Sequence, residues 1–155
     1  MYTQLVLKRF KCFAEEQKLP LSQITLLYGL NGRGKSSVLQ SLLLLFQSMK
    51  NNNSVESLYL IGDVINLGKY TDILNSAAQN SFSIGLACKT ENGTDTLDIE
   101  YSPAVDTPFV ARMQNVVIND QSRSDSQASL DSTEEEGNKI TTSLSDSVCL
   151  QMLKD

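Results

Sequence analysis

The residues best suited to chemistry lie in one glycine-rich stretch that joins two apolar runs. Residues 27–46 read LYGLNGRGKSSVLQSLLLLF, and residues 29–36 match the spacing G-x-x-x-x-G-K-[ST] of a phosphate-binding loop (P-loop). Glycines carry no Cβ, so successive backbone N–H groups can approach an anion closely. A helix that starts directly after the loop adds the positive end of its dipole. The spacing therefore predicts a site for the phosphate tail of a nucleotide.

The side chains of this loop have distinct expected roles. Lys35 is expected to neutralise the β- and γ-phosphate oxygens of ATP, and Ser36 to offer its hydroxyl to Mg²⁺. The predicted nucleotide-binding residues are Gly29, Asn31, Gly32, Arg33, Gly34, Lys35, Ser36 and Ser37.

The composition of the chain limits the classes of catalytic and metal site that it could contain. The chain contains no histidine, which excludes Ser-His-Asp and Cys-His nucleophilic schemes and histidine-based metal sites. Its formal charge is −5, yet residues 1–50 carry a net +5, so positive charge gathers around the glycine-rich turn. Three widely spaced cysteines argue against a disulfide framework and favour reduced thiols in the cytoplasm. No apolar run approaches the length of a membrane span, and no secretory signal precedes residue 10.

The elements that must position the loop can be read from apolar patterning. Residues 3–10 predict a strand, and AEEQKLPL (14–21) an edge strand that ends near Pro20. The run QITLLYG (23–29) lacks alternation, which predicts a strand buried on both faces. A helix is expected over residues 35–50, apolar around most of its circumference and ended by NNNS (51–54). This pattern indicates an α/β fold with a mixed sheet and a buried helix after the loop.

The second half of the chain predicts antiparallel strands, followed by a segment of different composition. SFSIGLACKT and TDTLDIEYS flank ENG (91–93), which indicates a β-hairpin, and residues 111–120 hold one more strand candidate. Residues 121–143 are acidic and serine-rich, as in a disordered insertion. We therefore expect a lobe over residues 1–120, this insertion over 121–143, and the start of a truncated helix over 144–155.

The residues between the invariant positions of the loop carry a family resemblance. Residues 31–37, NGRGKSS, are similar to the N-G-x-G-K-S-[SN] loop of the SMC, RecF and related ABC-type ATPases, and LKRFKCF (7–13) resembles the strand and turn that open those proteins. LQSLLLLFQS (39–48) and LIGDVINLGKYTDIL (60–74) look most like the overcoming-lysogenization-defect (OLD) type and neighbouring AAA/ABC ATPases. Phe10 and Phe13 match the opening motif and are expected to serve in packing.

The resemblance implies the fold of a P-loop ABC-type head and an ATP-dependent function. It implies a homodimer with nucleotide held between two protomers, and a nuclease or other effector as a partner. In the complete protein, ATP hydrolysis would control a nucleic-acid-directed effector in anti-phage defence. The alternative is a SMC/RecF-like head in DNA repair or DNA organisation that acts as an ATP-driven clamp. A GTPase or small-molecule kinase is disfavoured, because no N/TKxD motif is present.

Several parts that the resemblance requires are missing from the sequence. A Walker B strand ending in Asp-Glu and an LSGGQ-like signature are absent; NVVIND (115–120) is the nearest imitation of the former. Gln79 is the candidate for the expected water- or Mg²⁺-contacting glutamine, ahead of Gln47. We therefore expect an amino-terminal lobe only, with no catalytic residue in this segment and no ATP turnover by it alone. The negative charge and the lack of a basic stripe argue against direct nucleic-acid contact, which would come through the complete protein.

Overall fold

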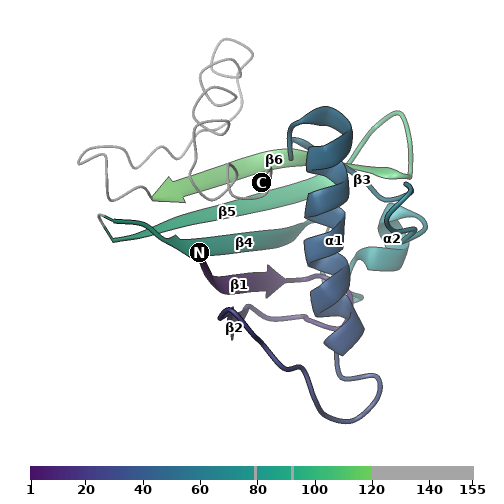
Figure 1. The fold of residues 1–155 in the computed structure, drawn as a ribbon. Coiled ribbons are helices and arrows are strands. Elements are labelled where there is room, and N and C mark those ends of the chain that lie inside the picture. The colour runs from purple at the N-terminus through teal and green to yellow at the C-terminus, as the bar shows by residue number, and fades with distance from the viewer. Residues whose placement is uncertain (79, 92, 120–155) are drawn as a thin grey trace.

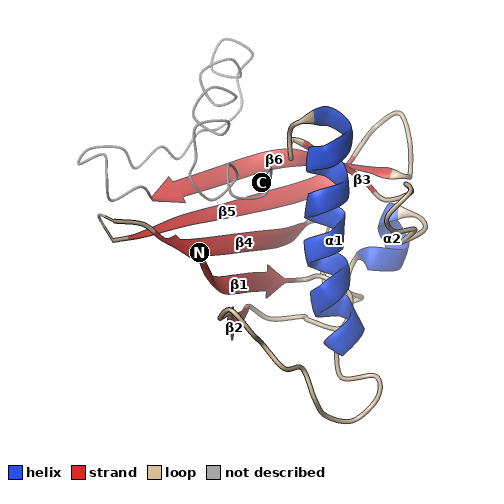
Figure 2. Ribbon diagram, viewed as in Figure 1, coloured by secondary structure: helices blue, strands red, loops and turns tan. Residues whose placement is uncertain are grey.

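Six β-strands form a single sheet, and one long helix crosses one of its faces (Figure 1). The computed structural model describes residues 1–78, 80–91 and 93–119. Within them the strand order is β2-β1-β4-β5-β6-β3, and all five neighbouring pairs are antiparallel. The strands are β1 (Tyr2–Lys8), β2 (Gln17–Pro20), β3 (Ser57–Tyr59), β4 (Phe82–Lys89), β5 (Thr94–Pro103) and β6 (Val110–Asn119). Figure 2 shows this sheet beside the helices α1 (Lys35–Asn52) and α2 (Tyr70–Ile73).

Alternating side chains decide which face of the sheet is buried. In β5, Leu97, Ile99 and Tyr101 are buried, whereas Asp98 and Glu100 between them are only partly covered. This period of two is typical of an antiparallel strand with one wet face. β4 and β5 pair from Phe82↔Tyr101 to Lys89↔Thr94, so the predicted hairpin is confirmed. The strands predicted near residues 3–10, 14–21 and 111–120 are also confirmed, and β2 lies at the sheet edge as expected.

Helix α1 closes the core by burying one of its faces. Its buried apolar residues join those of the sheet in one cluster that includes Leu5, Leu7, Ile84, Leu97, Val38, Leu44, Leu45 and Met49. The helix ends where the sequence predicts it: Asn53 adopts a left-handed backbone conformation (φ 56°), and its N–H donates to the Met49 carbonyl at 2.8 Å. Asparagine tolerates this conformation better than most residues, so NNNS is a suitable stop. No helix among the described residues is long and apolar enough to cross a membrane.

Two fold expectations were wrong, and a third holds in part. Residues 23–29 do not form a strand, and Ile24, Leu26, Tyr28 and Leu30 lie exposed. Because the run that would have supplied a parallel strand is outside the sheet, the expected mixed sheet is antiparallel in every described pair. Helix α1 packs on the sheet as expected, but its burial is partial, because Leu39, Leu43 and Phe46 are exposed. The segments 121–143 and 144–155 lie outside the described residues.

A buried glutamine fixes the chain that follows α1. Gln47 is 1% exposed; its Nε2 donates to the Tyr59 carbonyl at 2.8 Å, and its Oε1 accepts the N–H groups of Val64 and Ile65 at 3.0 and 2.8 Å. Gly62 also packs against this amide so closely that a Cβ would overlap it. Gln47 is therefore a structural residue, and the interpretation of it as a water-contacting glutamine is wrong. Gln79, the stronger candidate, lies outside the described residues.

We expect Gln47→Ala to lower the free energy of unfolding by at least ~2 kcal/mol. The change leaves three backbone groups without their partner, and each unsatisfied buried group costs about 1–3 kcal/mol. Gln40→Ala, on the same helix but without a side-chain partner of this kind, should stay within about 0.5 kcal/mol. Urea unfolding of both variants measures the difference; equal values would contradict the assigned role.

Candidate functional site

The glycine-rich loop enters α1 without a side-chain cap. Gly34 is the residue before the helix, in a left-handed conformation (φ 94°), and no side chain caps the helix N-terminus. No acidic residue lies in the first turn. The first N–H groups of an α-helix have no partner within the helix, and the dipole adds positive potential there. This end of α1 is therefore suited to an anion.

A cavity of about 300 Å³ lies at this helix end. Its lining consists of Cys12, Asn31, Gly32, Gly34, Lys35, Ser36 and Ser37. Six of the eight predicted nucleotide-binding residues thus surround one space; Arg33 is exposed and does not line it, and Gly29 contributes through its carbonyl. Small-molecule pockets span about 300–1,000 Å³. The volume suits a phosphate tail, and a base and ribose would need further surface.

Lys35 forms hydrogen bonds that cross the opening of the loop. Its Nζ donates to the carbonyl oxygens of Gly29 at 2.8 Å and Leu30 at 2.9 Å. An ammonium group has three N–H donors, so one remains for a ligand. The two bonds hold the positive charge over the loop and restrict the flexible side chain before any anion arrives.

The fit of Mg²⁺ depends on a single hydroxyl. Ser36 lines the cavity and is exposed, so its Oγ can reach a cation held by phosphate oxygens. Mg²⁺ at phosphates usually takes only one or two protein ligands and keeps several waters. No cluster of three or more His, Cys, Asp or Glu residues able to hold a metal occurs among the described residues. The residues present thus fit a phosphate-bound Mg²⁺ better than an all-protein metal site.

The turn after β1 supplies residues that the sequence analysis did not assign to the site. Cys12 lines the cavity, with its Sγ 3.8 Å from the Ser37 Oγ. A Cβ on Gly34 would lie 2.6 Å from Cζ of Phe13 and 2.8 Å from Cys12 Sγ, so the loop backbone rests directly on this turn. Beside them, burial lowers the pKa of Lys11, although Asp72 opposes that effect. The sequence K-C-F (residues 11–13) could have pointed to these residues. Spacing along the chain, however, does not show that the turn after β1 contacts the glycine-rich loop.

Comparison with known proteins gives a family. A family model described as an AAA domain matches residues 4–152. The chain belongs to the AAA domain family. This membership indicates an ATPase-type function with nucleotide binding. No curated protein matches the chain.

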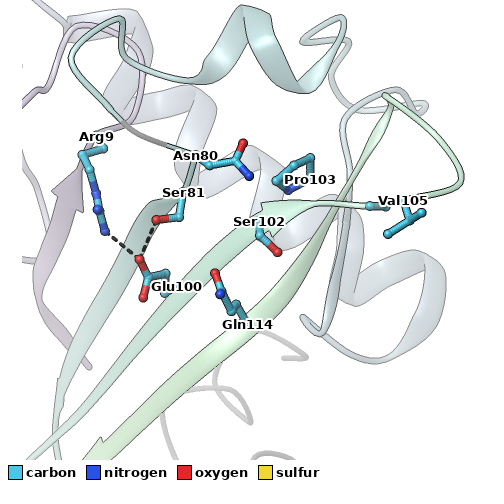
Figure 3. Close-up of a pocket in the computed structure, with 9 residues that line it drawn as sticks. Arg9, Asn80, Ser81, Glu100, Ser102, Pro103, Val105 and Gln114 are labelled. Carbon is cyan, nitrogen blue, oxygen red and sulfur yellow. Dashed lines mark hydrogen bonds and ion pairs between the residues drawn. The ribbon is translucent and has the colours of Figure 1, made fainter. Parts of the chain in front are cut away.

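A second cavity, of about 650 Å³, lies elsewhere in this AAA domain (Figure 3). At its wall Arg9 and Ser81 both point to Glu100: the Arg9 guanidinium lies 2.7 Å from Glu100 Oε1, and Ser81 Oγ donates to the same atom at 2.6 Å (Figure 3). Among the described residues that line this cavity, Arg9 is the one cation, and it is already paired with the Glu100 carboxylate, so these residues offer an anion no unpaired positive charge. The cavity's lining comes from β5 and β6, from Arg9 directly after β1, and from Asn80 and Ser81 directly before β4.

We expect Gly34→Ala to destabilise the AAA domain more than Gly32→Ala. Both positions have positive φ (94° and 79°), which costs a non-glycine residue roughly 1–2 kcal/mol. Only at Gly34 does the added Cβ meet Phe13 and Cys12, whereas nothing lies within 4 Å at Gly32. Overpacking of this kind adds typically about 1–3 kcal/mol. Urea unfolding of both variants tests the contact, and equal losses of stability would show that the loop does not rest on the turn.

Proposed function

We propose that this chain is the ATP-binding lobe of an ABC/SMC-like ATPase that, in the complete protein, hydrolyses ATP to control a nucleic-acid-directed effector. The observation that carries the nucleotide assignment is the arrangement of Lys35 over an uncapped helix N-terminus with glycine-rich backbone around it. The similarity of residues 7–13 and 31–37 to SMC and RecF proteins, and of residues 39–48 and 60–74 to OLD-type proteins, supports the finer part. The finer part includes a dimer with nucleotide between protomers and a role in anti-phage defence.

Different residues of the loop would bind different parts of the nucleotide and its cation. The N–H groups of residues 32–37 and the free N–H of Lys35 would hold the phosphate oxygens, and Ser36 Oγ would orient the cation. Bound Mg²⁺ supplies charge neutralisation at the β- and γ-phosphates. Lys35 keeps its position through the Gly29 and Leu30 carbonyls, so it contributes charge without a large loss of side-chain entropy.

Hydrolysis needs groups that do not line this cavity. No carboxylate belongs to the lining, so no described group is placed to orient or deprotonate an attacking water. Residues 115–119 of the NVVIND stretch lie in β6, separated from β1 by β4 and β5 in the sheet, and Asp120 lies outside the described residues. This position in the sheet argues against a Walker B role for that strand.

We expect Lys35→Ala to weaken binding of ATP·Mg²⁺ by at least tenfold, because Lys35 is the one cation among the described residues that line the cavity. The fold should persist, since Lys35 is only partly buried and its ammonium bonds only loop carbonyls. Isothermal titration calorimetry with ATP and Mg²⁺ measures the affinity, and thermal unfolding checks the fold. Lys50→Ala, at the opposite end of the same helix, is the matched control. Unchanged affinity in Lys35→Ala would contradict the nucleotide assignment.

We expect residues 1–155 alone to bind ATP without turning it over. None of the described residues that line the cavity carries a carboxylate for water activation, so the phosphate-release rate should equal that of Lys35→Ala. A phosphate-release assay on purified protein makes the comparison. A Lys35-dependent rate above background would show that this chain carries its own catalytic groups.

A further inference from the structure

The turn that follows β1 has a strained backbone. Arg9 and Lys11 both lie in the left-handed region, with φ values of 58° and 51°. This conformation costs a residue other than glycine roughly 1–2 kcal/mol. Neither side chain is of the short polar kind that tolerates it best. Such strain persists only where the surrounding structure holds the backbone in place, and it is concentrated at functional sites.

Hydrogen bonds from one neighbouring segment hold the backbone of this turn. The Lys11 N–H donates to the Ile73 carbonyl at 2.7 Å, and the Asn75 N–H donates to the Arg9 carbonyl at 2.9 Å. Asn75 Nδ2 also donates to the Lys11 carbonyl. All three bonds involve residues 73–75, so they join the turn to one segment only.

The Arg9 side chain joins the turn to a separate part of the fold. Its Nη2 lies 2.7 Å from Glu100 Oε1 on β5, and the hydroxyl of Ser81, directly before β4, donates to the same oxygen at 2.6 Å (Figure 3). The Arg9 Nε is buried and has no hydrogen-bond partner among the described residues. A buried N–H group without a partner costs about 1–3 kcal/mol. Arg9 therefore reaches Glu100 in spite of two unfavourable features, its strained backbone and its Nε.

The other end of the same turn supports the phosphate loop. Cys12 lines the phosphate cavity, and a Cβ on Gly34 would lie 2.6 Å from Cζ of Phe13. A shift of the turn would therefore move the surface on which the loop backbone rests. The turn contributes to two cavities: Arg9 lines the larger one, of about 650 Å³, and Cys12 lines the smaller one at the start of α1.

We propose that Arg9, Ser81 and Glu100 position this turn and thereby set the affinity of the phosphate loop for nucleotide. The inference rests on the proposed nucleotide function. None of the three residues lines the phosphate cavity, so they are positioning residues and not ligands. Glu100 holds Arg9, Arg9 holds the strained turn, and the turn supports Gly34 through Phe13. By linkage, bound nucleotide should also strengthen the contact between Arg9 and Glu100.

The contact between Arg9 and Glu100 need not contribute much to overall stability. Exposed ion pairs are typically worth about 0–1 kcal/mol, and these two side chains are 27 and 32% exposed. The proposal therefore predicts a local effect: without the contact the turn loosens and nucleotide binding weakens, while the free energy of unfolding changes little. A role in stability alone predicts the opposite pattern.

Hydrogen exchange tests the position of the turn without nucleotide. Arg9→Asn in the full chain removes the contact and leaves a residue that tolerates the left-handed backbone. We expect exchange of the Lys11 N–H, which bonds the Ile73 carbonyl, to become faster by about fivefold or more, the lower end of couplings between sites. The matched control is Arg112→Asn, because Arg112 forms an exposed ion pair with Asp106 at 3.5 Å. Equal exchange rates in the two variants would overturn the proposal.

Isothermal titration calorimetry with ATP and Mg²⁺ tests the effect on the phosphate loop. Arg9→Asn and Glu100→Ala should each weaken binding by about fivefold or more, and the double variant should weaken it no further, because both changes remove one contact. Arg9→Lys should restore most of the affinity, since a single nitrogen, Nη2, makes the hydrogen bond to Glu100. Arg112→Asn should leave the affinity unchanged. Urea unfolding of these variants should agree within about 1 kcal/mol.

Three results would overturn the positioning role: unchanged ATP affinity in Arg9→Asn, additive losses in the double variant, or no recovery in Arg9→Lys. The nucleotide function can fail separately. If the wild type binds no nucleotide while Arg9→Asn accelerates exchange, the nucleotide function fails and the hold of Arg9 on the turn stands. If the wild type binds ATP and neither exchange nor affinity responds to Arg9→Asn, the positioning role alone fails.

Discussion

The position of the phosphate loop depends on the close contact between Gly34 and the turn that follows β1. A hydrogen atom in place of a side chain lets the loop backbone rest on Phe13 and Cys12, where a Cβ would overlap the ring. Phe13 in turn packs against the hydrophobic core, and its neighbour Phe10 is fully buried. Because α1 begins at the next residue, this contact sets both the place of the loop and the point from which the helix crosses the sheet.

The other end of α1 is held by polar groups instead. Ser48 Oγ donates to the Leu44 carbonyl at 2.9 Å and accepts the Tyr59 N–H at 3.2 Å, next to the amide bonds of Gln47. Buried polar groups with satisfied partners specify a single arrangement more strictly than apolar contacts do. The helix is therefore fixed at both ends, and Lys35 bonds two carbonyl groups of the loop that precedes it.

One sheet cannot cover a helix that is apolar on most sides. The antiparallel sheet buries Val38, Leu44, Leu45 and Met49, whereas Leu39, Leu43 and Phe46 remain outside. A helix with such a circumference is typical of a position between two layers. The same reasoning applies to residues 24–28, whose apolar side chains gain nothing from their exposed position. Both exposed segments lie outside the antiparallel sheet of the described residues, which does not contain the expected parallel strand.

The sequence by itself determined the local features: the bounds of α1, the hairpin of β4 and β5, the edge position of β2, and the loop whose glycines, lysine and serine surround one cavity. These follow from short-range rules of periodicity, turn chemistry and backbone freedom. Only the tertiary structure decided that Cys12 borders the loop, that Gln47 is a structural amide, and that residues 23–29 stay outside the sheet. A strand forms only where a partner supplies its hydrogen bonds, and a side chain's role depends on neighbours distant in sequence. Neither condition is written in the local pattern of residues.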